Sequence, residues 1–589
     1  MAVTASAEDV RWDLSDLCSG ADEAREQLTE LVERTKGFGE RYRGRIAELD
    51  AQELRSLLDE LDELEQDRNR LQVYVMGRLH LDTADAEAND LATFGRDRSS
   101  EIENELLFVG VEWLALDDAR AEELIDSDEL APYAHKLRVG RQEKPYIKTE
   151  PEEQALNARQ PAVAAWQSLH DRHVATIEVD FRGEPHNVTQ LLAYVHDPDR
   201  DLRHDALDTL YRDGLEPRAD VLAAAYDAVV GDRLGVDRLR GFADPMQPTN
   251  MSNELDTETV EAMMRATEES FGIARRWFEL KAGLLGLDKL ELADQYAPLG
   301  ESRAIPWNEG VEMVDTAFSR FSPRIGEIFR ACLDAGHVDA APRPGKMGGA
   351  YCTPATKTIL PYVLLNWTDK FRDVTTLAHE FGHATHNALA LEQQTYQSHR
   401  TGIALAEVPS TFAQYITDDY LLETEEDRST RASVAIDRIE NAFAAVFRQV
   451  TLARFEQDAY GQRAEGLALT ADRLSEIWRD RNERYYGDAL ILPDGYRLGW
   501  SYIPHFIHVR FYTYAYSFAQ LVALLLHRLY AQDPEAFSAR YLDFLGAGGS
   551  ASPQDLLAPF GLDLRSTDTW REAFAELESQ VEDAAALTT

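Results

Sequence analysis

Apolar residues recur at every third or fourth position through most of the chain, which is the spacing of one face of an α-helix. The clearest pattern lies in 54–75, where the apolar positions are Leu54, Leu57, Leu58, Leu61, Leu64, Leu71, Tyr74 and Val75. Charged residues fill the positions between them, so the pattern predicts amphipathic helices with one buried face. The same spacing predicts further helices in 21–36, 84–115, 119–127, 152–170, 197–230 and 255–285.

Short β signals interrupt this helical period in two places. Apolar residues in 174–183 lead to Gly183 and predict a hairpin. In 340–367 a loop with two prolines and a glycine precedes two short apolar runs, 348–352 and 359–365, which predict two strands. Beyond residue 400 the helical pattern returns, with breaks at 486–500 and 546–549. The sequence therefore predicts a mainly α protein with a small β-sheet.

The length of the chain, 589 residues, allows a large core and two or more subdomains. The sequence contains no internal repeats and no low-complexity linker, so we expect these subdomains to pack tightly together. We place the boundary between an N-terminal helical region, 1–195, and the remainder, 196–589, near residue 195.

The second predicted strand leads into the most informative helix of the sequence. Asp369 stands where an N-cap is expected, and the apolar positions that follow, up to Leu391, are Val374, Leu377, Ala378, Phe381, Ala384 and Ala388. In the middle of this helix the sequence reads HEFGH, from His379 to His383. Residues four apart lie on the same helix face, so His379 and His383 can offer two imidazole nitrogens to one metal ion.

This motif is typical of a zinc hydrolase. Two neutral imidazoles leave Zn²⁺ positive enough to acidify a water, and Glu380, beside the first histidine, can accept the proton of that water without binding the metal. The alternative interpretation is two surface histidines beside a solvated glutamate. The regular amphipathic helix around the motif favours the zinc site, with one Zn²⁺ per chain.

A catalytic zinc usually has three protein ligands, so a third ligand must lie elsewhere in the sequence. One class of zinc peptidases takes its third ligand from a nearby histidine, in the pattern H-E-x-x-H-x-x-G-x-x-H. This chain does not fit that pattern, because His386 stands at the glycine position and Leu389 at the position of the last histidine. Glu407 is the best candidate, because it interrupts an apolar run, 404–411, where an unpaired carboxylate would be unfavourable. His386 and His399 are alternative ligands, and a solvated surface glutamate is the alternative interpretation of Glu407.

Composition narrows the possible partners and the cellular location. With 105 acidic and 60 basic residues, the formal net charge is −45, so we expect neither nucleic acid nor a membrane as partner. Cys18, Cys332 and Cys352 are too few and too scattered for a disulfide framework, which indicates a reducing compartment. Residues 1–9 lack the features of a signal peptide, and no segment is apolar enough to span a bilayer. We expect a soluble, cytoplasmic protein, and no feature predicts its oligomeric state.

Four blocks of the sequence resemble the thimet oligopeptidase family of zinc metallopeptidases, and its oligoendopeptidase F branch most closely. Three of them are GKMGGAY at 345–351 with PYVLLNW at 361–367, HEFGH at 379–383, and IPHF at 503–506 with FYTYAY at 511–516. The fourth is Glu407, which follows His383 at the spacing that this family uses for its third zinc ligand. Weaker similarity at 12–15 and 296–299 extends the resemblance over almost the whole chain. The thimet branch carries an aspartate three residues before the ligand glutamate. This chain has Ala404 there, which favours the F branch.

The resemblance implies a large helical zincin-like peptidase with a small β-sheet beside the motif helix and the active site in a deep channel. It also implies a metalloendopeptidase that hydrolyses internal bonds of oligopeptides, because such a channel would exclude folded proteins. Zn²⁺ held by His379, His383 and Glu407 would polarise the scissile carbonyl. Glu380 would take the proton of the attacking water and deliver it to the leaving nitrogen.

The resemblance further implies that His505 and a tyrosine from 512–516 stabilise the tetrahedral oxyanion. It indicates Tyr514 first and Tyr512 next. Without the resemblance, the tyrosines in 512–516 are equally consistent with an aromatic patch in a helical core, and His508 is an alternative to His505.

The first strand before the motif helix is a candidate for holding substrate. Its glycines would allow a peptide backbone to approach closely and pair with the strand. Cys352 lies in this strand, and we expect it to be a buried structural thiol.

Two other functions are compatible with parts of the sequence. A metallocarboxypeptidase of related helical fold would need a cation for the carboxylate at the substrate's C-terminus, and Arg497 or Arg510 could supply it. A non-catalytic peptide-binding scaffold is disfavoured, because every candidate ligand and Glu380 are present.

Overall fold

The computed structural model describes residues 6–299 and 303–588. Within these ranges the chain is mainly α-helical, with short strands in three small sheets. This confirms the predicted mainly α class with a small β component. Residues 1–5, part of the segment on which the expected lack of a signal peptide depends, lie outside the described residues.

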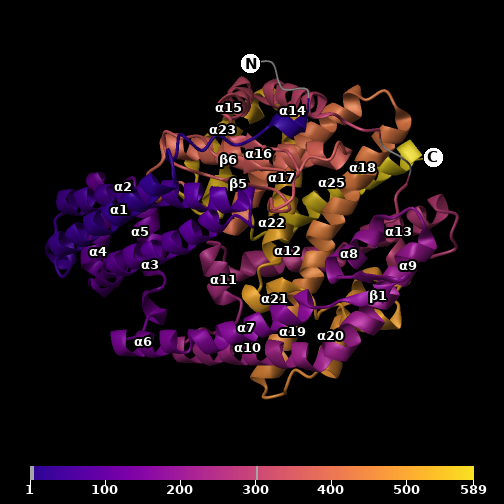
Figure 1. Ribbon diagram of the computed structural model, residues 1–589, viewed down its shortest axis with the longest axis horizontal. Coiled ribbons are helices and arrows are strands. Elements are labelled where there is room, and N and C mark those ends of the chain that lie inside the picture. The colour runs from indigo at the N-terminus through magenta and orange to yellow at the C-terminus, as the bar shows by residue number, and fades with distance from the viewer. Residues whose placement is uncertain (1–5, 300–302, 589) are drawn as a thin grey trace. The chain divides into compact units, whose positions relative to one another are not determined.

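The chain divides into two compact units, each assembled from separate segments (Figure 1). The first unit comprises Met1–Lys144, Arg303–Thr424 and Leu526–Leu562, and the second comprises Pro145–Ser302, Glu425–Leu525 and Asp563–Thr589. Residue 195, where the sequence predicts a boundary, lies inside the second unit. That boundary stays a prediction.

The first unit holds a group of N-terminal helices, a small sheet, and the helices that follow the sheet. Its helices are α1 (Ala21–Tyr42), α2 (Ala51–Leu81), α3 (Ala86–Ala115), α4 (Asp118–Ile125), α5 (Ala134–Arg141), α14 (Trp307–Phe321), α15 (Pro323–Asp334), α16 (Phe371–Gln393), α17 (Ile403–Thr424), α23 (Pro534–Ala547) and α24 (Pro553–Leu557). Its strands are β4 (Val338–Asp339), β5 (Tyr351–Thr353) and β6 (Tyr362–Leu364).

The second unit is also helical, and helix α22 (Tyr514–Gln532) passes from it into the first unit. Its other helices are α6 (Glu150–Ala158), α7 (Gln160–Ala175), α8 (Val188–Ala193), α9 (Arg200–Thr209), α10 (Ala219–Arg240), α11 (Gln247–Ser252), α12 (Thr257–Glu269), α13 (Phe271–Leu284), α18 (Arg428–Phe443), α19 (Gln449–Ala464), α20 (Ala471–Tyr486), α21 (Pro504–His508) and α25 (Thr567–Thr588). Its strands are β1 (Val179–Phe181), β2 (Glu184–His186), β3 (Leu290–Glu291) and β7 (Leu490–Ile491).

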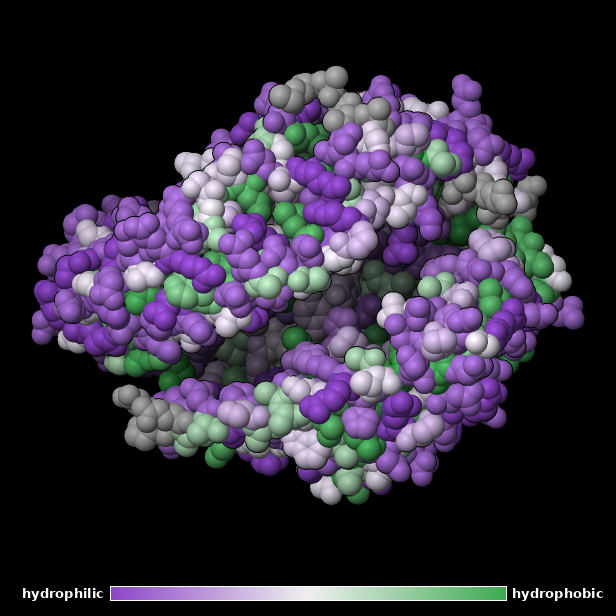
Figure 2. All heavy atoms as spheres, in the orientation of Figure 1, coloured by the Kyte–Doolittle hydropathy of each residue, from purple (hydrophilic) through white to green (hydrophobic). Residues whose placement is uncertain are grey.

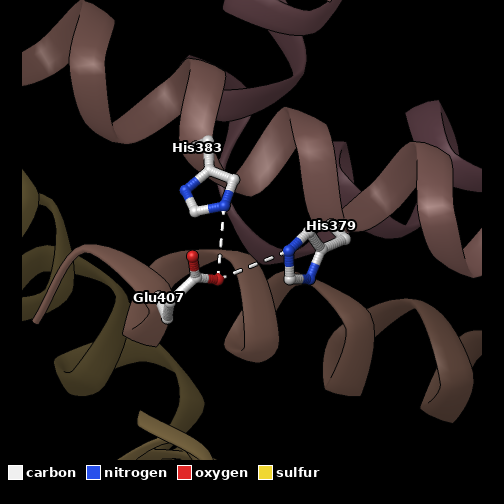
Figure 3. Close-up of side chains that lie close together, drawn as sticks. All are labelled: His379, His383 and Glu407. Carbon is white, nitrogen blue, oxygen red and sulfur yellow. Dashed lines mark ion pairs between the residues drawn. The ribbon is translucent and has the colours of Figure 1, made fainter. Parts of the chain in front are cut away.

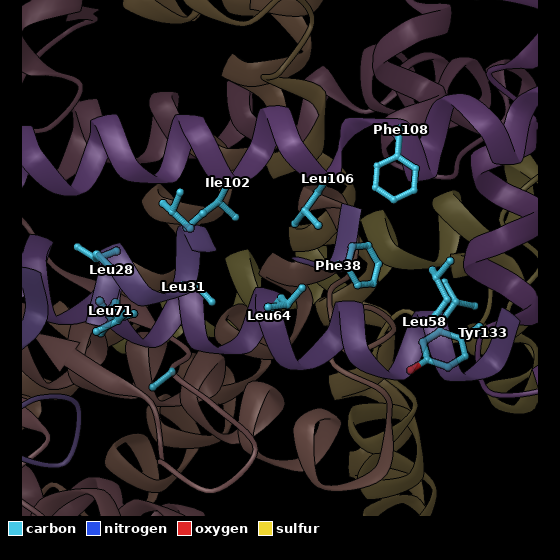
Figure 4. Close-up of a cluster of buried hydrophobic side chains, with 14 of the residues drawn as sticks. Leu28, Leu31, Phe38, Leu58, Leu64, Leu71, Ile102, Leu106, Phe108 and Tyr133 are labelled. Atoms are coloured by element: carbon cyan, nitrogen blue, oxygen red, sulfur yellow. The ribbon is translucent and has the colours of Figure 1, made fainter. Parts of the chain in front are cut away.

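The N-terminal helices α1, α2 and α3 pack against one another along the apolar stripes that the sequence predicts. Helix α2 starts at a capping box, in which the side chains of Asp50 and Glu53 each accept a hydrogen bond from the other residue's backbone N–H. Figure 4 shows the shared core, to which these helices and the segment near α5 contribute Leu28, Leu31, Phe38, Leu58, Leu64, Leu71, Ile102, Leu106, Phe108 and Tyr133.

The sheet beside the motif helix has three strands in the order β4–β6–β5. Strand β4 runs parallel to β6, and β5 runs antiparallel to it, with Cys352 opposite Val363. The indole of Trp12 donates to the carbonyl oxygens of His337 and Val363, at 3.0 and 2.9 Å. These bonds attach the N-terminal segment to the sheet, which gives the weak sequence similarity around Trp12 a structural role.

Two predicted elements differ from the structure at their ends. The helix predicted in 152–170 is two helices, α6 and α7, and Pro161 stands in the first turn of the second. The predicted hairpin is present as β1 and β2, turned by Arg182 and Gly183 at φ values of 55° and 90°. Val174, predicted as part of the hairpin, ends α7 instead, because the helical spacing continues to Ala175.

The surface agrees with the strongly acidic composition. Hydrophilic residues dominate the face shown in Figure 2, and apolar residues are scattered over it. In the described part of the chain, no helix is both long and apolar enough to cross a membrane.

Candidate metal centre

Helices α16 and α17 approach each other closely at Gly382. A Cβ atom at this position would lie 2.5 Å from the Cα atom of Ser410 and 2.6 Å from the carbonyl oxygen of Pro409. Both are backbone atoms of a helix, so no side chain can be accommodated without moving α17. The close approach brings Glu407, one turn before Ser410, to the face of α16 that carries the two histidines.

His379, His383 and Glu407 converge on one point (Figure 3). The Oε2 atom of Glu407 lies 3.5 Å from Nε2 of His379 and 3.4 Å from Nε2 of His383. Zinc bonds of about 2.0–2.1 Å at tetrahedral angles place two ligand atoms about 3.3–3.4 Å apart. The observed spacing therefore fits a single ion of this size. Within the described ranges these three residues form the group that could hold a metal.

Neighbouring polar side chains orient these ligands. Nδ1 of His379 lies 3.2 Å from the amide Oε1 of Gln414, which can only accept a hydrogen bond, so Nδ1 carries the proton and Nε2 presents its lone pair to the site. The hydroxyl of Ser410 donates to Oε2 of Glu407 at 3.2 Å. The sequence analysis missed both residues. Gln414 lies seven residues after Glu407, two turns along the same helix face, and this spacing could have revealed it.

The carboxyl of Glu380 is almost completely buried, with 6% of the residue exposed. Burial raises its pKa, while the nearby charges of His379 and His383 lower it. The backbone N–H of Cys352 in β5 donates to it, which links the sheet to the motif helix. A carboxyl group whose pKa is raised in this way is suited to accept and return a proton near neutral pH.

Glu407 is held in its ionised form. Burial alone would raise the pKa of this carboxyl, but the adjacent imidazoles of His379 and His383 keep it well below its usual range. The alternative ligands predicted from the sequence are not part of the group. His386 is buried away from it, and burial lowers its pKa to about 3. His399 is also buried, and its Nδ1 bonds the carbonyl oxygen of Tyr396.

The predicted N-cap of the motif helix is wrong. Helix α16 begins at Phe371, and its first backbone groups are capped by Asp373, whose carboxylate accepts from the N–H groups of Thr368 and Lys370 at 2.6 and 3.1 Å. Asp369 instead has a left-handed backbone, with φ of 59°, and accepts from the indole of Trp367 at 3.0 Å. That conformation turns its side chain away from the helix start.

In the second unit, the structure places His505 beside two tyrosines. Its ring stacks on Tyr512 with the ring centres 5.3 Å apart and meets the edge of Tyr516 at 6.1 Å. Tyr514, in contrast, is fully buried, and its hydroxyl accepts from Nδ2 of Asn253 at 3.1 Å. His508, the alternative to His505, forms an exposed ion pair with Asp171. The catalytic roles of His505, Tyr512 and Tyr514 stay predictions, and Tyr516 joins the candidates.

The loop that carries these tyrosines is held from the interior of the second unit. Phe511 has a left-handed backbone, with φ of 50°, which is unfavourable for a residue with a bulky side chain. Both carboxylate oxygens of the buried Glu456 accept from its N–H, at 3.1 and 3.2 Å. Arg233 donates to the carbonyl oxygens of Phe506 and Ile507 at 2.9 and 2.6 Å. These bonds fix the backbone between His505 and the tyrosines.

Replacing Glu456 with Gln should flatten the pH dependence of stability. Burial raises the pKa of Glu456 from its ordinary value of 4.5 to about 8. Between these values the folded protein keeps a proton that the unfolded chain has released, so the free energy of unfolding falls as the pH rises from about 4.5 to about 8. The Gln variant lacks this titration. Urea unfolding at pH 5, 7 and 9 should therefore show a smaller alkaline loss for E456Q than for the wild type.

The exposed Glu483, which pairs with Arg479 on the surface, provides the control for this measurement. We expect E483Q to keep the wild-type pH dependence. Equal pH dependence in E456Q and the wild type would show that the carboxyl of Glu456 does not titrate in this range.

Two histidines and a glutamate from adjacent helices, with a buried carboxyl beside the first histidine, define a metallopeptidase site in a mainly helical fold. Residues 193–576 match the model of peptidase family M3, and residues 112–178 match the model described as Oligopeptidase F. The chain belongs to peptidase family M3.

Individual relatives agree with this assignment. The chain is 25% identical to Oligopeptidase PepF of Bacillus subtilis (strain 168) over 588 residues, covering 98% of this chain and 87% of the relative. It is 26% identical to Group B oligopeptidase PepB of Streptococcus agalactiae over 594 residues, covering 98% and 96%. Its fold is similar to the crystal structure of oligoendopeptidase-F from Enterococcus faecium, with a TM-score of 0.71 and 20% identity over 96% of this chain and 98% of the other.

These comparisons confirm three predictions. The resemblance to the oligoendopeptidase F branch is correct, the fold is that of a large helical peptidase with a small sheet beside the motif helix, and the enzyme class is peptidase.

Proposed function

We propose that the protein is a zinc-dependent endopeptidase that hydrolyses internal bonds of short oligopeptides in the cytoplasm. The observation that carries this proposal is the convergence of His379, His383 and Glu407 on one point, with the carboxyl of Glu380 beside them. Membership of peptidase family M3 and similarity to proteins named oligopeptidases support it. The net charge of −45 disfavours nucleic acid and membranes as partners.

The donor set fits zinc, with one ion per chain. Two imidazole nitrogens and one carboxylate are the ligands of many catalytic zinc sites, and the hydrogen bond from His379 to Gln414 supplies the orientation that such sites require. When bound, zinc would supply a Lewis acid that polarises the scissile carbonyl and lowers the pKa of a water to near 7.

Glu380 performs the proton transfers in this proposal. Its carboxylate accepts a proton from the attacking water and then delivers it to the leaving nitrogen of the peptide. Burial raises the pKa of this carboxyl, and the backbone N–H of Cys352 helps to hold it in place. One group can therefore serve first as base and then as acid.

Strand β5 supplies a binding surface for the substrate backbone. It stands at the edge of its sheet, where among the described residues it pairs only with β6, and it packs against α16. A peptide that pairs with an edge strand gains main-chain hydrogen bonds without any requirement for particular side chains. This mode suits a peptidase that accepts varied sequences.

His505 and the tyrosines beside it are the proposed donors to the oxyanion of the tetrahedral intermediate. Tyr512 and Tyr516 are partly exposed and flank His505, whereas Tyr514 is fully buried. We therefore favour Tyr512 and Tyr516 over Tyr514. Removal of such a donor typically lowers the rate about a hundredfold or more.

The carboxypeptidase alternative loses its two predicted anchors. Arg497 pairs with Glu216, and Arg510 pairs with Asp237 at 2.7 Å, so both cations already have carboxylate partners. An endopeptidase needs neither arginine for binding.

The decisive experiment combines metal analysis with cleavage of internally quenched peptides blocked at both ends. We expect one zinc per chain, cleavage between the blocked ends, loss of activity on chelation and recovery when zinc is returned. Cleavage only of peptides with a free C-terminus would indicate a carboxypeptidase, and full activity in the metal-free protein would exclude the zinc mechanism.

A further inference from the structure

Arg448 is a cation without a counter-ion in the second unit. It ends the π-helical turn Ala444–Arg448 between α18 and α19, and π-turns are frequent at functional sites. Its side chain is partly buried. In the described ranges no hydrogen bond or ion pair joins its guanidinium to another group.

Tyrosines are the main electrostatic neighbours of this guanidinium. They are Tyr296, Tyr486, Tyr496 and Tyr502. Neutral hydroxyl groups can hydrogen-bond an anion beside a guanidinium, but they cannot neutralise the cation. Tyr296 belongs to the segment 296–299, which shows weaker similarity to the family. The proposed catalytic steps do not use this segment.

Three other cations with buried side chains in the described residues have anionic partners from the chain itself. Arg203 pairs with Asp294 at 2.8 Å, Lys346 pairs with Asp339 at 2.6 Å, and Lys281 pairs with Glu440. Burial of a charge is unfavourable unless it is paired. Arg448 departs from this rule, which indicates that its anion comes from outside the chain.

The π-helical turn packs directly against the segment that carries the proposed oxyanion donors. The hydroxyl of Thr513 donates to the carbonyl oxygen of Gln449 at 3.1 Å, and that of Ser517 donates to the carbonyl oxygen of Ala445 at 3.1 Å. Burial lowers the pKa of His505, and the positive charge of Arg448 lowers it further. Arg448 therefore lies within electrostatic range of the residue proposed to contact the reacting carbonyl.

We propose that Arg448 and the surrounding tyrosine hydroxyls bind the C-terminal carboxylate of the oligopeptide substrate. This proposal rests on the proposed function, because an unmodified oligopeptide carries a carboxylate at its end. A guanidinium can bind a carboxylate through two parallel hydrogen bonds, which fixes its orientation.

The test uses two quenched peptides of identical sequence, blocked at the N-terminus and ending either in a free carboxylate or in an amide. We expect the zinc-loaded wild type to prefer the free acid by about 10- to 100-fold in kcat/KM, mainly through KM. Arg448→Gln should lose this preference. Arg448→Lys, which keeps the charge, should restore part of the preference. Arg497→Gln, whose arginine pairs with Glu216, should keep all of it.

Each outcome decides the role of Arg448. Equal kcat/KM for the acid and the amide in the wild type would overturn it, and so would a Gln variant that still prefers the acid. Cleavage of the amide shows that the variant is folded, and if the Gln variant does not fold, the wild-type comparison and the Lys variant decide. If the wild type cleaves neither peptide, the proposed function fails. Calorimetric binding of a short peptide as acid and as amide then tests Arg448 alone, and equal affinities would overturn the proposal.

Discussion

Replacing Glu380 with Gln is expected to lower kcat/KM for an oligopeptide by about 10²–10⁴-fold, the range that a positioned general base contributes. The amide has almost the same shape but cannot accept a proton from water. The zinc content should stay at the wild-type value, because the ligands are His379, His383 and Glu407. The measurement pairs steady-state kinetics with elemental analysis of the same preparation.

Glu392 provides the matched control, because it lies near the end of the same helix, α16, and pairs with Arg324 on the surface. We expect E392Q to keep both rate and metal. Wild-type kinetics in E380Q would exclude Glu380 as the base, and a variant that has lost its zinc would place this carboxylate among the ligands instead.

Replacing Glu407 with Ala is expected to weaken zinc binding by more than about 100-fold, since the loss of an outer hydrogen-bond partner alone costs about 10–100-fold. The carboxylate is the anionic member of the group, and the adjacent imidazoles keep its pKa low and hold it ionised at neutral pH. Without it, two neutral imidazoles face an ion from one side only. Competition with a chromophoric chelator measures the affinity, and peptide cleavage should fall with metal occupancy.

The control for this variant is Glu423, which lies on the same helix, α17, and pairs with Arg320 at the surface. E423Q should bind zinc as the wild type does. Wild-type affinity in the Glu407 variant would mean that another residue completes the site.

The sequence predicted those residues of the metal site whose positions follow the helical period. The spacing of His379 and His383 places both on one face of a helix whatever the surrounding fold, and the apolar residues around Glu407 mark it as a partly buried carboxylate. The crossing of α16 and α17 at Gly382 then brings them together. The crossing itself depends on contacts between backbones, which no periodicity records.

Two backbone conformations that are rare for their residue types could not be predicted from the sequence. The left-handed conformation of Asp369 shifts the helix cap to Asp373, four residues later. The left-handed conformation of Phe511, stabilised by Glu456, turns the loop so that Tyr512 reaches His505 while Tyr514 enters the core. The alternation of tyrosines with other residues in FYTYAY, at 511–516, does not predict this turn.

The hydrophobic pattern predicted most helices of the fold but not their grouping into units. Amphipathic stripes identify α1, α2 and α3 because their partners are neighbours in sequence. The two units join segments hundreds of residues apart. The bonds from Trp12 to His337 and Val363 are an example, since nothing near Trp12 indicates a strand so distant in the chain.

The interleaving of the two units has a consequence for synthesis on the ribosome. Helix α23, which packs against α16, belongs to the last segment of the first unit, Leu526–Leu562. Gln394, which follows α16, bonds the carbonyl oxygen of Gly546 in this segment at 2.9 Å. A nascent chain that has already exposed both histidines and Glu407 still lacks this support. The metal centre should therefore mature only after the segment Leu526–Leu562 has been synthesised and has left the ribosome.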